Sequence, residues 1–263
     1  MRVAILFLAM TAACAPVMAQ TRPGEPPPAG WALSLGFGAG WHSNPLELTT
    51  RARGDVFISS EIGLAYRLAL WQGGALTLSG TGTGEHYSRE ETAGFVRGIV
   101  GVSLSQSWQG FTLAATAGHR KTMDHDLAGH ESASSELGIN LIRPIAITDG
   151  WTLLIFSRVA RRFFNDGTED QFRAGANATL VYRTGAWSFR AGSGFGYVLE
   201  DKTPILPRIN DRSISLRAGI GYEWAKDREV TLGANYTRTY SSYAPNRTKI
   251  FTFQPRVGAT IRF

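Results

Sequence analysis

The sequence predicts an all-β protein: a closed, antiparallel transmembrane barrel of about twelve strands. Three observations support this prediction. Apolar residues alternate with small or polar ones over runs longer than the strands of most soluble proteins, the connections between runs alternate between short and long, and the tryptophans gather at run ends beside the short connections. No segment after residue 30 shows the 3.6-residue periodicity of an amphipathic helix.

The alternation is clear in the first run. From Trp31 to Trp41 the odd positions carry tryptophan, leucine, phenylalanine or alanine, whereas the even positions carry alanine, serine and glycine. Because successive side chains of a strand point to opposite faces, one face is apolar and the other is small and polar. The same pattern predicts strands at 31–43, 55–70, 75–88, 95–108, 111–124, 132–147, 151–165, 171–184, 187–200, 213–225, 230–243 and 250–263.

The connections between these strands alternate in length. The short ones are expected at 71–74, 109–110, 148–150, 185–186 and 226–229. The longer and more polar ones are expected at 44–54, 89–94, 125–131, 166–170, 201–212 and 244–249. Short periplasmic turns opposite longer extracellular loops are typical of membrane-spanning barrels. An even number of strands then places both ends of the barrel on the periplasmic side.

A secreted β-sandwich has the same alternation and is the main structural alternative. Strand length favours the barrel, because about 13 residues at ~3.3 Å each, tilted by ~40°, rise some 30 Å and cross the apolar layer of a bilayer. The residue sorting agrees, since a barrel in lipid turns its leucines, valines and phenylalanines outward. Its glycines, threonines, asparagines and arginines then surround a wet lumen.

The tryptophans are sorted by depth. Six of them are expected to form a membrane girdle beside the short turns: Trp31, Trp71, Trp108, Trp151, Trp187 and Trp224. Trp41 lies at the long-loop end, where the sequence also places Tyr87, Tyr197, Tyr240 and Tyr243. Amphipathic rings at both ends of the strands mark the two membrane–water boundaries.

The N-terminal segment predicts export. Arg2, the apolar run 3–13 and the small residues 17–19 read as a cleaved signal peptide over 1–19. Residues 20–30 form a Pro/Gly-rich periplasmic tail, and 31–263 form the barrel. A lipoprotein signal ending at Cys14 is a weaker alternative. After cleavage at residue 19 no cysteine remains, so disulfide and thiol chemistry are not expected.

The net charge of +6 and the isoelectric point near 9.7 would ordinarily raise nucleic acid as a partner. The export signal argues against this partner. We therefore attribute the basic excess to arginines on the polar faces of the strands. No cofactor is expected.

The last strand carries a resemblance to a known class. The segment IFTFQPRVGATIRF alternates apolar residues and ends in Phe263. It resembles the C-terminal signal that Gram-negative outer-membrane β-barrels present to their insertion machinery. The resemblance implies a location in the outer membrane, with outer-membrane lipid and lipopolysaccharide as surroundings. WHSNPLEL at 41–48 is more loosely similar to a stretch in barrels for surface-lipoprotein assembly and exopolysaccharide export.

The polar faces predict a pore. The residues expected to line it are Arg67, Arg97, Arg158, Arg173, Arg183, Arg190, Arg217, Glu223 and Arg256, with Arg120, Arg162 and Arg262 also pointing inward beside Glu61 and Glu136. Unpaired arginines in a narrow wall favour anions. The pattern resembles small porins for acidic oligosaccharides and implies small anionic solutes. The alternative is a structural or export-associated barrel, in which the arginines pair with glutamates.

Two chemical alternatives are weaker. The His86-Tyr87-Ser88 segment places a histidine and a serine on one strand face near the outer rim, as an outer-leaflet lipid hydrolase would need. The sequence 124–126, Asp-His-Asp, offers ligands for a divalent ion. An H-x-S pair and a polar loop tip both arise often by chance, so neither a catalytic residue nor a metal site is assigned.

Overall fold

The strands of the computed structural model follow the predicted order. The structure describes residues 29–46, 53–124, 132–165, 170–201, 208–244 and 247–263. Its strands are β1 (Gly30–His42), β2 (Asp55–Trp71), β3 (Gly74–Tyr87), β4 (Phe95–Trp108), β5 (Phe111–Asp124), β6 (Ser132–Thr148), β7 (Trp151–Phe164), β8 (Gln171–Thr184), β9 (Trp187–Glu200), β10 (Asn210–Ala225), β11 (Arg228–Ser241) and β12 (Lys249–Arg262). The short 3-10 helix η1 (Glu91–Ala93) precedes β4. The segments predicted as signal peptide (1–19) and tail (20–30) lie, except for residues 29 and 30, outside the described residues.

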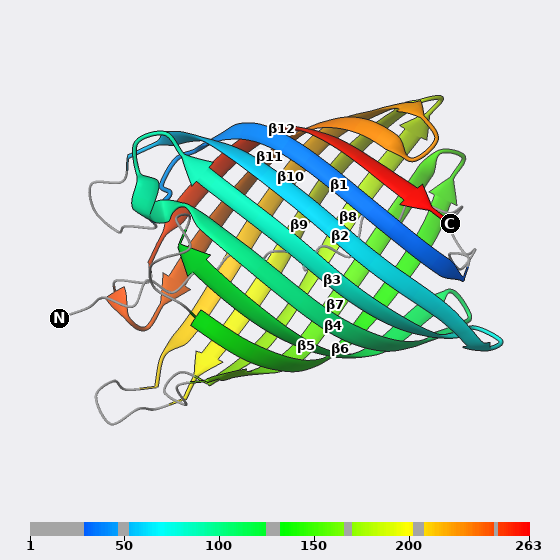
Figure 1. Cartoon of the computed structure of the whole chain (residues 1–263), viewed down its shortest axis with the longest axis horizontal. Helices are drawn as coiled ribbons and strands as arrows, with labels where there is room; N and C mark the ends of the chain where they lie inside the picture. Colours follow the sequence, from blue (N-terminus) through cyan, green and yellow to red (C-terminus); the bar gives the residue numbers. More distant parts are fainter. Residues whose placement is uncertain (1–28, 47–52, 125–131, 166–169, 202–207, 245–246) are drawn as a thin grey trace.

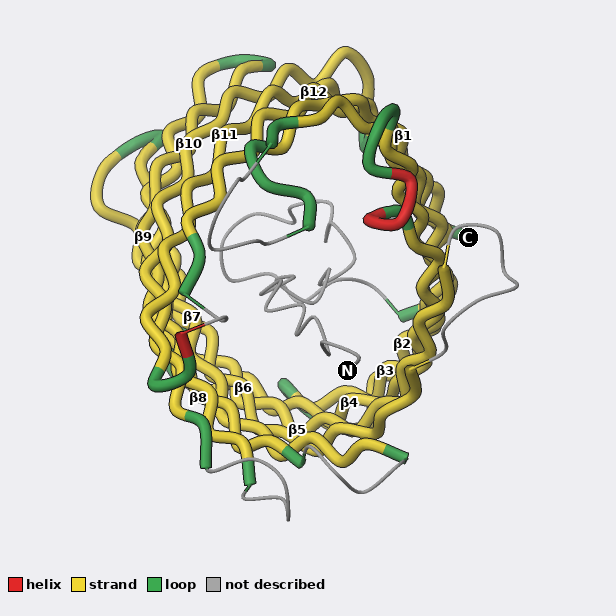
Figure 2. Tube along the Cα trace, turned by 90° about the vertical axis from the view of Figure 1, so that its left-hand side faces the viewer, coloured by secondary structure: helices red, strands yellow, loops and turns green. Residues whose placement is uncertain are grey.

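The twelve strands form one closed antiparallel barrel (Figures 1 and 2). Each strand pairs with its sequence neighbours, and β1 pairs with β12 to close the ring. The pairing continues to the chain terminus, because the Trp31 amide donates to the Phe263 carbonyl at 2.9 Å and the Phe263 amide donates back to the Trp31 carbonyl at 3.1 Å. The predicted fold class is confirmed.

The strand boundaries differ most at β10 and β11. The sequence predicts starts at 213 and 230, whereas β10 begins at Asn210 and β11 at Arg228. Polar side chains there resemble a loop, yet the added residues continue the ladders: Asn210 pairs with Leu199 and Arg228 with Ala259. Hydrogen bonding between strands therefore extends further than hydrophobic alternation.

The two faces of the sheet are sorted as predicted. Phe37 is 66% exposed and Val100 is 59% exposed on the outer face, whereas Ser34 on the inner face is 9% exposed. So large an apolar exterior is stable only where lipid, not water, surrounds it. Separately, none of the helices among the described residues is long and apolar enough to cross a bilayer.

The short turns depend on residues that adopt positive φ. Gly73 (φ 75°) and Gly150 (φ 79°) complete two of them, in the left-handed region that glycine adopts without a steric penalty. The turn between β10 and β11 uses Asp227 instead, at φ 63°. Its carboxylate accepts a hydrogen bond from Arg262 at 2.7 Å, which ties this turn to β12.

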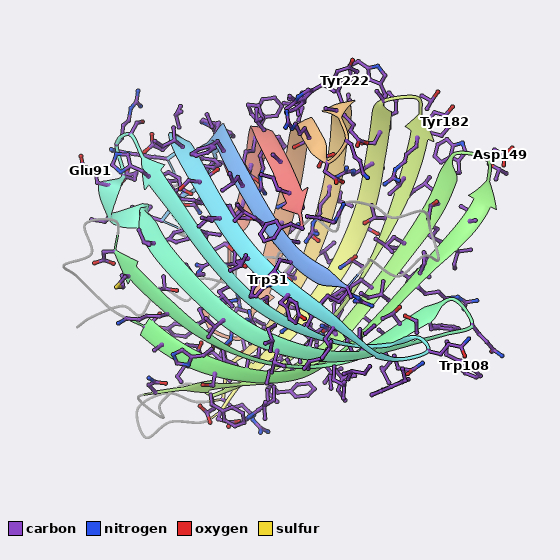
Figure 3. The ribbon with its side chains drawn as sticks, turned by 45° about the vertical axis from the view of Figure 1, so that its right-hand side comes forward. Trp31, Glu91, Trp108, Asp149, Tyr182 and Tyr222 are labelled. Atoms are coloured by element: carbon purple, nitrogen blue, oxygen red, sulfur yellow. The ribbon has the colours of Figure 1, made fainter. Side chains whose placement is uncertain are left out.

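The aromatic girdle beside the short turns lies on the outer face. The six predicted tryptophans are all exposed, from 38% for Trp151 to 68% for Trp108. Figure 3 shows Trp108 and Tyr182 at the same end of the barrel as the turn residue Asp149, with Glu91 at the opposite end. Neighbouring rings reinforce the band, since Trp151 and Tyr182 stack with centroids 4.7 Å apart.

The prediction for Tyr87 is wrong. Tyr87 was assigned to the outer girdle, but it points into the barrel and is 4% exposed. It packs on Phe57 with ring centroids 5.4 Å apart and donates a hydrogen bond to Glu85 at 2.9 Å. The apolar cluster of Phe57, Tyr87 and Ala93 fills the inner wall at the long-loop end, where the segment after β3 folds inward. An aromatic residue at a strand end does not by itself reveal which face it occupies.

The two-faced wall leads to a stability prediction. Lysine at Val100, near the middle of the outer face of β4, should lower the free energy of unfolding by about 2–4 kcal/mol, because it places a charge in the apolar layer. Thr81 provides a control. It pairs with Ile99, the neighbour of Val100, and so lies at nearly the same depth, but its side chain faces inward. Thr81→Lys should cost far less. Denaturant unfolding in lipid vesicles, followed by tryptophan fluorescence, measures both changes; equal losses would contradict the assignment of faces.

Candidate functional site: the charged inner wall

All eleven arginines predicted to point inward lie on the inner face of the barrel. Their positions alternate with outward apolar residues, and the strand registers place them beside other inward residues; Arg67 pairs with Thr77, Arg183 with Ser188 and Arg217 with Asn235. They are Arg67, Arg97, Arg120, Arg158, Arg162, Arg173, Arg183, Arg190, Arg217, Arg256 and Arg262. Glu223 shares this face at the short-turn rim, where it pairs with Glu229.

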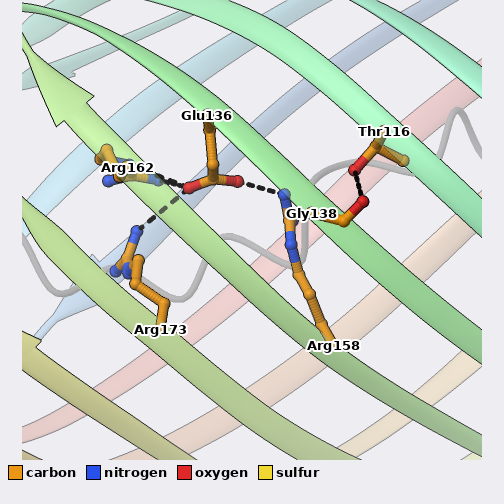
Figure 4. Close-up of polar contacts among 6 residues, drawn as sticks. All are labelled: Thr116, Glu136, Gly138, Arg158, Arg162 and Arg173. Carbon is orange, nitrogen blue, oxygen red and sulfur yellow. Dashed lines mark hydrogen bonds and ion pairs between the residues drawn. The ribbon is translucent and has the colours of Figure 1, made fainter.

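One carboxylate gathers three of these arginines (Figure 4). Glu136 on β6 accepts two hydrogen bonds from Arg162, at 2.9 and 2.7 Å, through one oxygen, and its other oxygen binds Arg158. The Arg173 guanidinium lies 4.0 Å from the oxygen that Arg162 also binds. The side chains of Glu136, Arg162 and Arg173 are 15%, 8% and 15% exposed. We call these four residues the Glu136 cluster.

Small residues make room for this cluster. Gly138 pairs with Ala160 in the register between the Glu136–Arg162 pair and the Asn140–Arg158 pair. A Cβ atom at Gly138 would lie only 3.1 Å from the Ala160 Cβ. With no larger side chain there, Arg158 extends past Gly138 to reach Glu136 (Figure 4). The sequence reads Gly138 only as part of the polar face and does not reveal this role.

Two further arginines extend the positive charge toward β4. Arg120 pairs with Ser134 on β6, two residues from Glu136, and its guanidinium lies within electrostatic range of Arg97, Arg162 and Arg173. Among the described residues, Arg120 forms no hydrogen bond and no ion pair. Arg97 donates to Thr122 at 3.3 Å and lies over the Phe95 ring at 4.4 Å. The Glu136 cluster and Arg120 therefore carry four cations and one carboxylate, and Glu200 on β9 is a second carboxylate within electrostatic range of Arg173.

The charges at the short-turn end are balanced instead. A cavity of about 250 Å³ there is lined by Arg183, Arg190, Arg228 and Arg256 and by Glu61, Glu223, Asp227 and Glu229. Arg190 binds Glu229 at 3.2 Å, and Arg256 binds Glu61 at 3.2 Å. The inward position of Glu229 is not apparent from the sequence, where this residue falls in the expected turn at 226–229. The extended start of β11 places it on the inner face, two residues before Thr231.

Apart from Arg97, which contacts Thr122 and the Phe95 ring, the inward arginines fall into two groups. Within the described residues, Arg67, Arg120, Arg183 and Arg217 form no ion pair, whereas Arg158, Arg162, Arg173, Arg190, Arg256 and Arg262 each have an acidic partner. The expectation of an unpaired arginine wall holds for the first group. The second group follows the alternative, in which glutamate and aspartate partners neutralise the arginines.

The inner acidic residues at the long-loop end hold the loops. Asp55, which the sequence analysis did not single out, is 3% exposed and accepts hydrogen bonds from the amides of Val56, Arg89 and Glu90, each at 2.8 Å. Asp211, 1% exposed, binds the Ser241 hydroxyl. These two carboxylates therefore stabilise the strand ends and loops at the mouth of the barrel through hydrogen bonds.

The serine of the H-x-S pair takes part in the same network. The Ser88 hydroxyl donates to Asp55 at 2.5 Å, so its single hydrogen is directed at a carboxylate and not at the His86 ring. This bond gives Ser88 a role in the loop after β3. Of the Asp-His-Asp segment at 124–126 only Asp124 is described; the other two residues lie outside the described part of the chain. Among the described residues, no group of three or more histidine, cysteine, aspartate or glutamate side chains is placed to hold a metal.

Solved outer-membrane β-barrels are similar to this chain. An outer-membrane channel from Pseudomonas putida F1 has a TM-score of 0.61 and 12% identity, covering 92% of this chain and 100% of that chain. The β domain of the Bordetella autotransporter BrkA has a TM-score of 0.53 and 14% identity, covering 89% of this chain and 100% of that chain. No protein-family model and no curated protein matches the sequence. These similarities concern the fold, which is that of outer-membrane β-barrels.

The Glu136 cluster predicts a specific stability effect. Glu136→Gln leaves three arginines without their carboxylate and should lower the free energy of unfolding by about 2 kcal/mol. Glu229→Gln is the matched control, because among the described residues Glu229 forms an ion pair with Arg190 alone and is more exposed than Glu136; it should cost less than about 1 kcal/mol. Denaturant unfolding at low ionic strength tests both. A loss at Glu229 as large as at Glu136 would contradict the shared role of Glu136.

Proposed function

We propose that this outer-membrane β-barrel is a narrow pore that favours small anionic solutes. The observation that carries the proposal is the Glu136 cluster together with Arg120: three guanidinium groups on the inner wall contact one carboxylate, and a fourth lies within electrostatic range of it without an ion pair. A twelve-strand barrel encloses a narrow lumen, so a passing ion stays close to its wall.

The physical basis is the potential inside a confined aqueous path. A unit charge about 8 Å from an ion in water contributes about 0.5 kcal/mol, which changes the local ion concentration about twofold. Several uncompensated arginines multiply this effect, and the low-dielectric wall strengthens it. Arg217, on the wall formed by β9–β11, adds a cation without an acidic partner among the described residues. Carboxylate or phosphate groups would match the planar donors of arginine.

The charge-balanced cavity at the short-turn end favours a second candidate function. There the arginines and acidic residues pair, as a structural or export-associated barrel without conductance would require. We prefer the pore to this second candidate because cations are in excess around Glu136. Conductance separates the two candidates directly.

The pore predicts anion preference that depends on the inner arginines. In planar bilayers with a KCl gradient, the wild-type protein should conduct steadily, with a reversal potential displaced toward chloride. Arg120→Gln combined with Arg217→Gln should shift this potential toward potassium, because each change removes a cation that has no acidic partner among the described residues. The expected change in the permeability ratio is about twofold or more per arginine.

Arg143→Gln is the control, because Arg143 is a cation on the outer face of β6, where it lies over the Phe111 ring at 4.3 Å. It should leave the ion preference unchanged. A protein that inserts and remains silent would overturn the pore and support the structural candidate. Conductance with no anion preference would contradict the role given to the arginines.

A further inference from the structure

The ionised side chains of the outer wall have one sign. Within the described strands, the outward positions carry Lys121, Arg143, Arg161, Arg212, Arg228, Arg238 and Lys249, and no aspartate or glutamate. The inner wall, by contrast, mixes both signs. Cations on a lipid-facing surface lie where they meet headgroups, so this distribution indicates contact with anionic lipid.

Three of these cations form one patch at the long-loop end, which we call the outer basic patch: Arg212, Arg238 and Lys249. Arg238 on β11 pairs directly with Lys249 on β12. Arg212 on β10 lies diagonally across from Arg238, because Arg238 pairs with Ile214, two residues further along β10. All three side chains are exposed. Like charges directly opposite one another in a sheet are destabilising unless an anion lies between them.

No acidic side chain of the described residues compensates this patch. Arg212, Arg238 and Lys249 form no ion pair or side-chain hydrogen bond with any described residue. Arg238 lies over the Tyr240 ring, 4.6 Å from its centroid. The outward Arg161 on β7 differs, since it binds Asp201. The outer basic patch therefore lacks a counterion within the part of the chain that the structure describes.

The surface below the patch is apolar. Ile214, Tyr236 and Phe251 are exposed by 49%, 36% and 39% on the same three strands, and Leu216 continues the surface toward the middle of the membrane at 54%. Cations at the rim above an acyl-chain surface match an amphiphile with a negatively charged head. A free inorganic anion has no apolar group that could contact this apolar surface.

We propose that the outer basic patch binds the phosphate groups of a phosphorylated outer-leaflet lipid of the lipopolysaccharide class. The lipid phosphates lie between Arg238, Lys249 and Arg212, and the acyl chains lie along Ile214, Tyr236 and Phe251. Binding supplies the missing counter-charge and attaches one lipid to β10–β12. This inference concerns the outer wall and does not depend on the pore.

The test compares two variants of the full-length folded protein. The first combines Arg212→Gln, Arg238→Gln and Lys249→Gln; the control is Arg143→Gln, which removes an outward cation at the short-turn end. Native mass spectrometry counts the lipopolysaccharide retained from mixed micelles. The patch variant should bind on the order of a hundredfold more weakly, whereas the control should bind like the wild type. Equal retention by the wild type and the patch variant would overturn the proposal.

The free energy of unfolding in vesicles gives a second readout, because the stability difference between the wild type and the patch variant should change sign with the lipid. In phosphatidylcholine vesicles the patch variant should be as stable as the wild type or more stable, because like charges no longer repel. In vesicles containing lipopolysaccharide the wild type should be the more stable. If the triple variant does not fold, Arg238→Gln alone, with Arg238→Lys as the conservative control, answers the same question. A patch variant that is destabilised equally in both vesicles would show a structural role and overturn the proposal.

Two further binding experiments distinguish lipid phosphate from free inorganic phosphate. Lipid A without its phosphates should bind the wild type no better than it binds the patch variant. Inorganic phosphate at millimolar concentration should not displace bound lipopolysaccharide. Full displacement would show a site for free phosphate and overturn the assignment to a lipid. Chloride conductance, measured in parallel, reports on the pore separately.

Discussion

The need to pair every backbone amide within the apolar layer governs this structure. Lipid offers no hydrogen-bond partner, so a sheet that crosses it cannot keep an open edge. β1 and β12, at opposite ends of the chain, therefore pair along their length, and Trp31 and Phe263 exchange hydrogen bonds at the seam. The alternation of side chains then follows from closure, because a closed sheet has one face toward lipid and one toward the lumen. The long strands and the positive-φ turns make this closure possible.

The inner wall shows how charge is distributed once the ring is closed. Neighbouring strands bring together residues distant in sequence, so that Glu136 on β6 serves Arg158 and Arg162 on β7 and Arg173 on β8. At the short-turn end, Arg190 and Glu229 come from β9 and β11, with β10 between them. One region of the wall is thereby left basic and the other neutral. This difference in charge balance underlies the proposed ion preference.

The outer wall is governed by the surrounding lipid. Its apolar residues and tryptophans fix the depth of the barrel in the membrane, while its few charges are all basic within the described strands. The outer basic patch sets like charges side by side, and no acidic side chain of the described residues compensates them. A charged lipid head would complete this surface, so the solvent and the fold have to be considered together.

The sequence by itself determined the class of fold, the twelve strands and the inward direction of eleven arginines, because side-chain direction in a strand follows a period of two residues. Only the tertiary structure decided which charges meet. The Glu136 cluster depends on the register of β6, β7 and β8 and on the space above Gly138, and neither can be read from local alternation. The faces of Tyr87 and Glu229 could not be predicted for a related reason. Both lie at strand ends, where too few alternating residues remain to show which face a side chain occupies. Cross-strand register depends on hydrogen bonds between segments far apart in the chain, so it is settled only when the barrel closes.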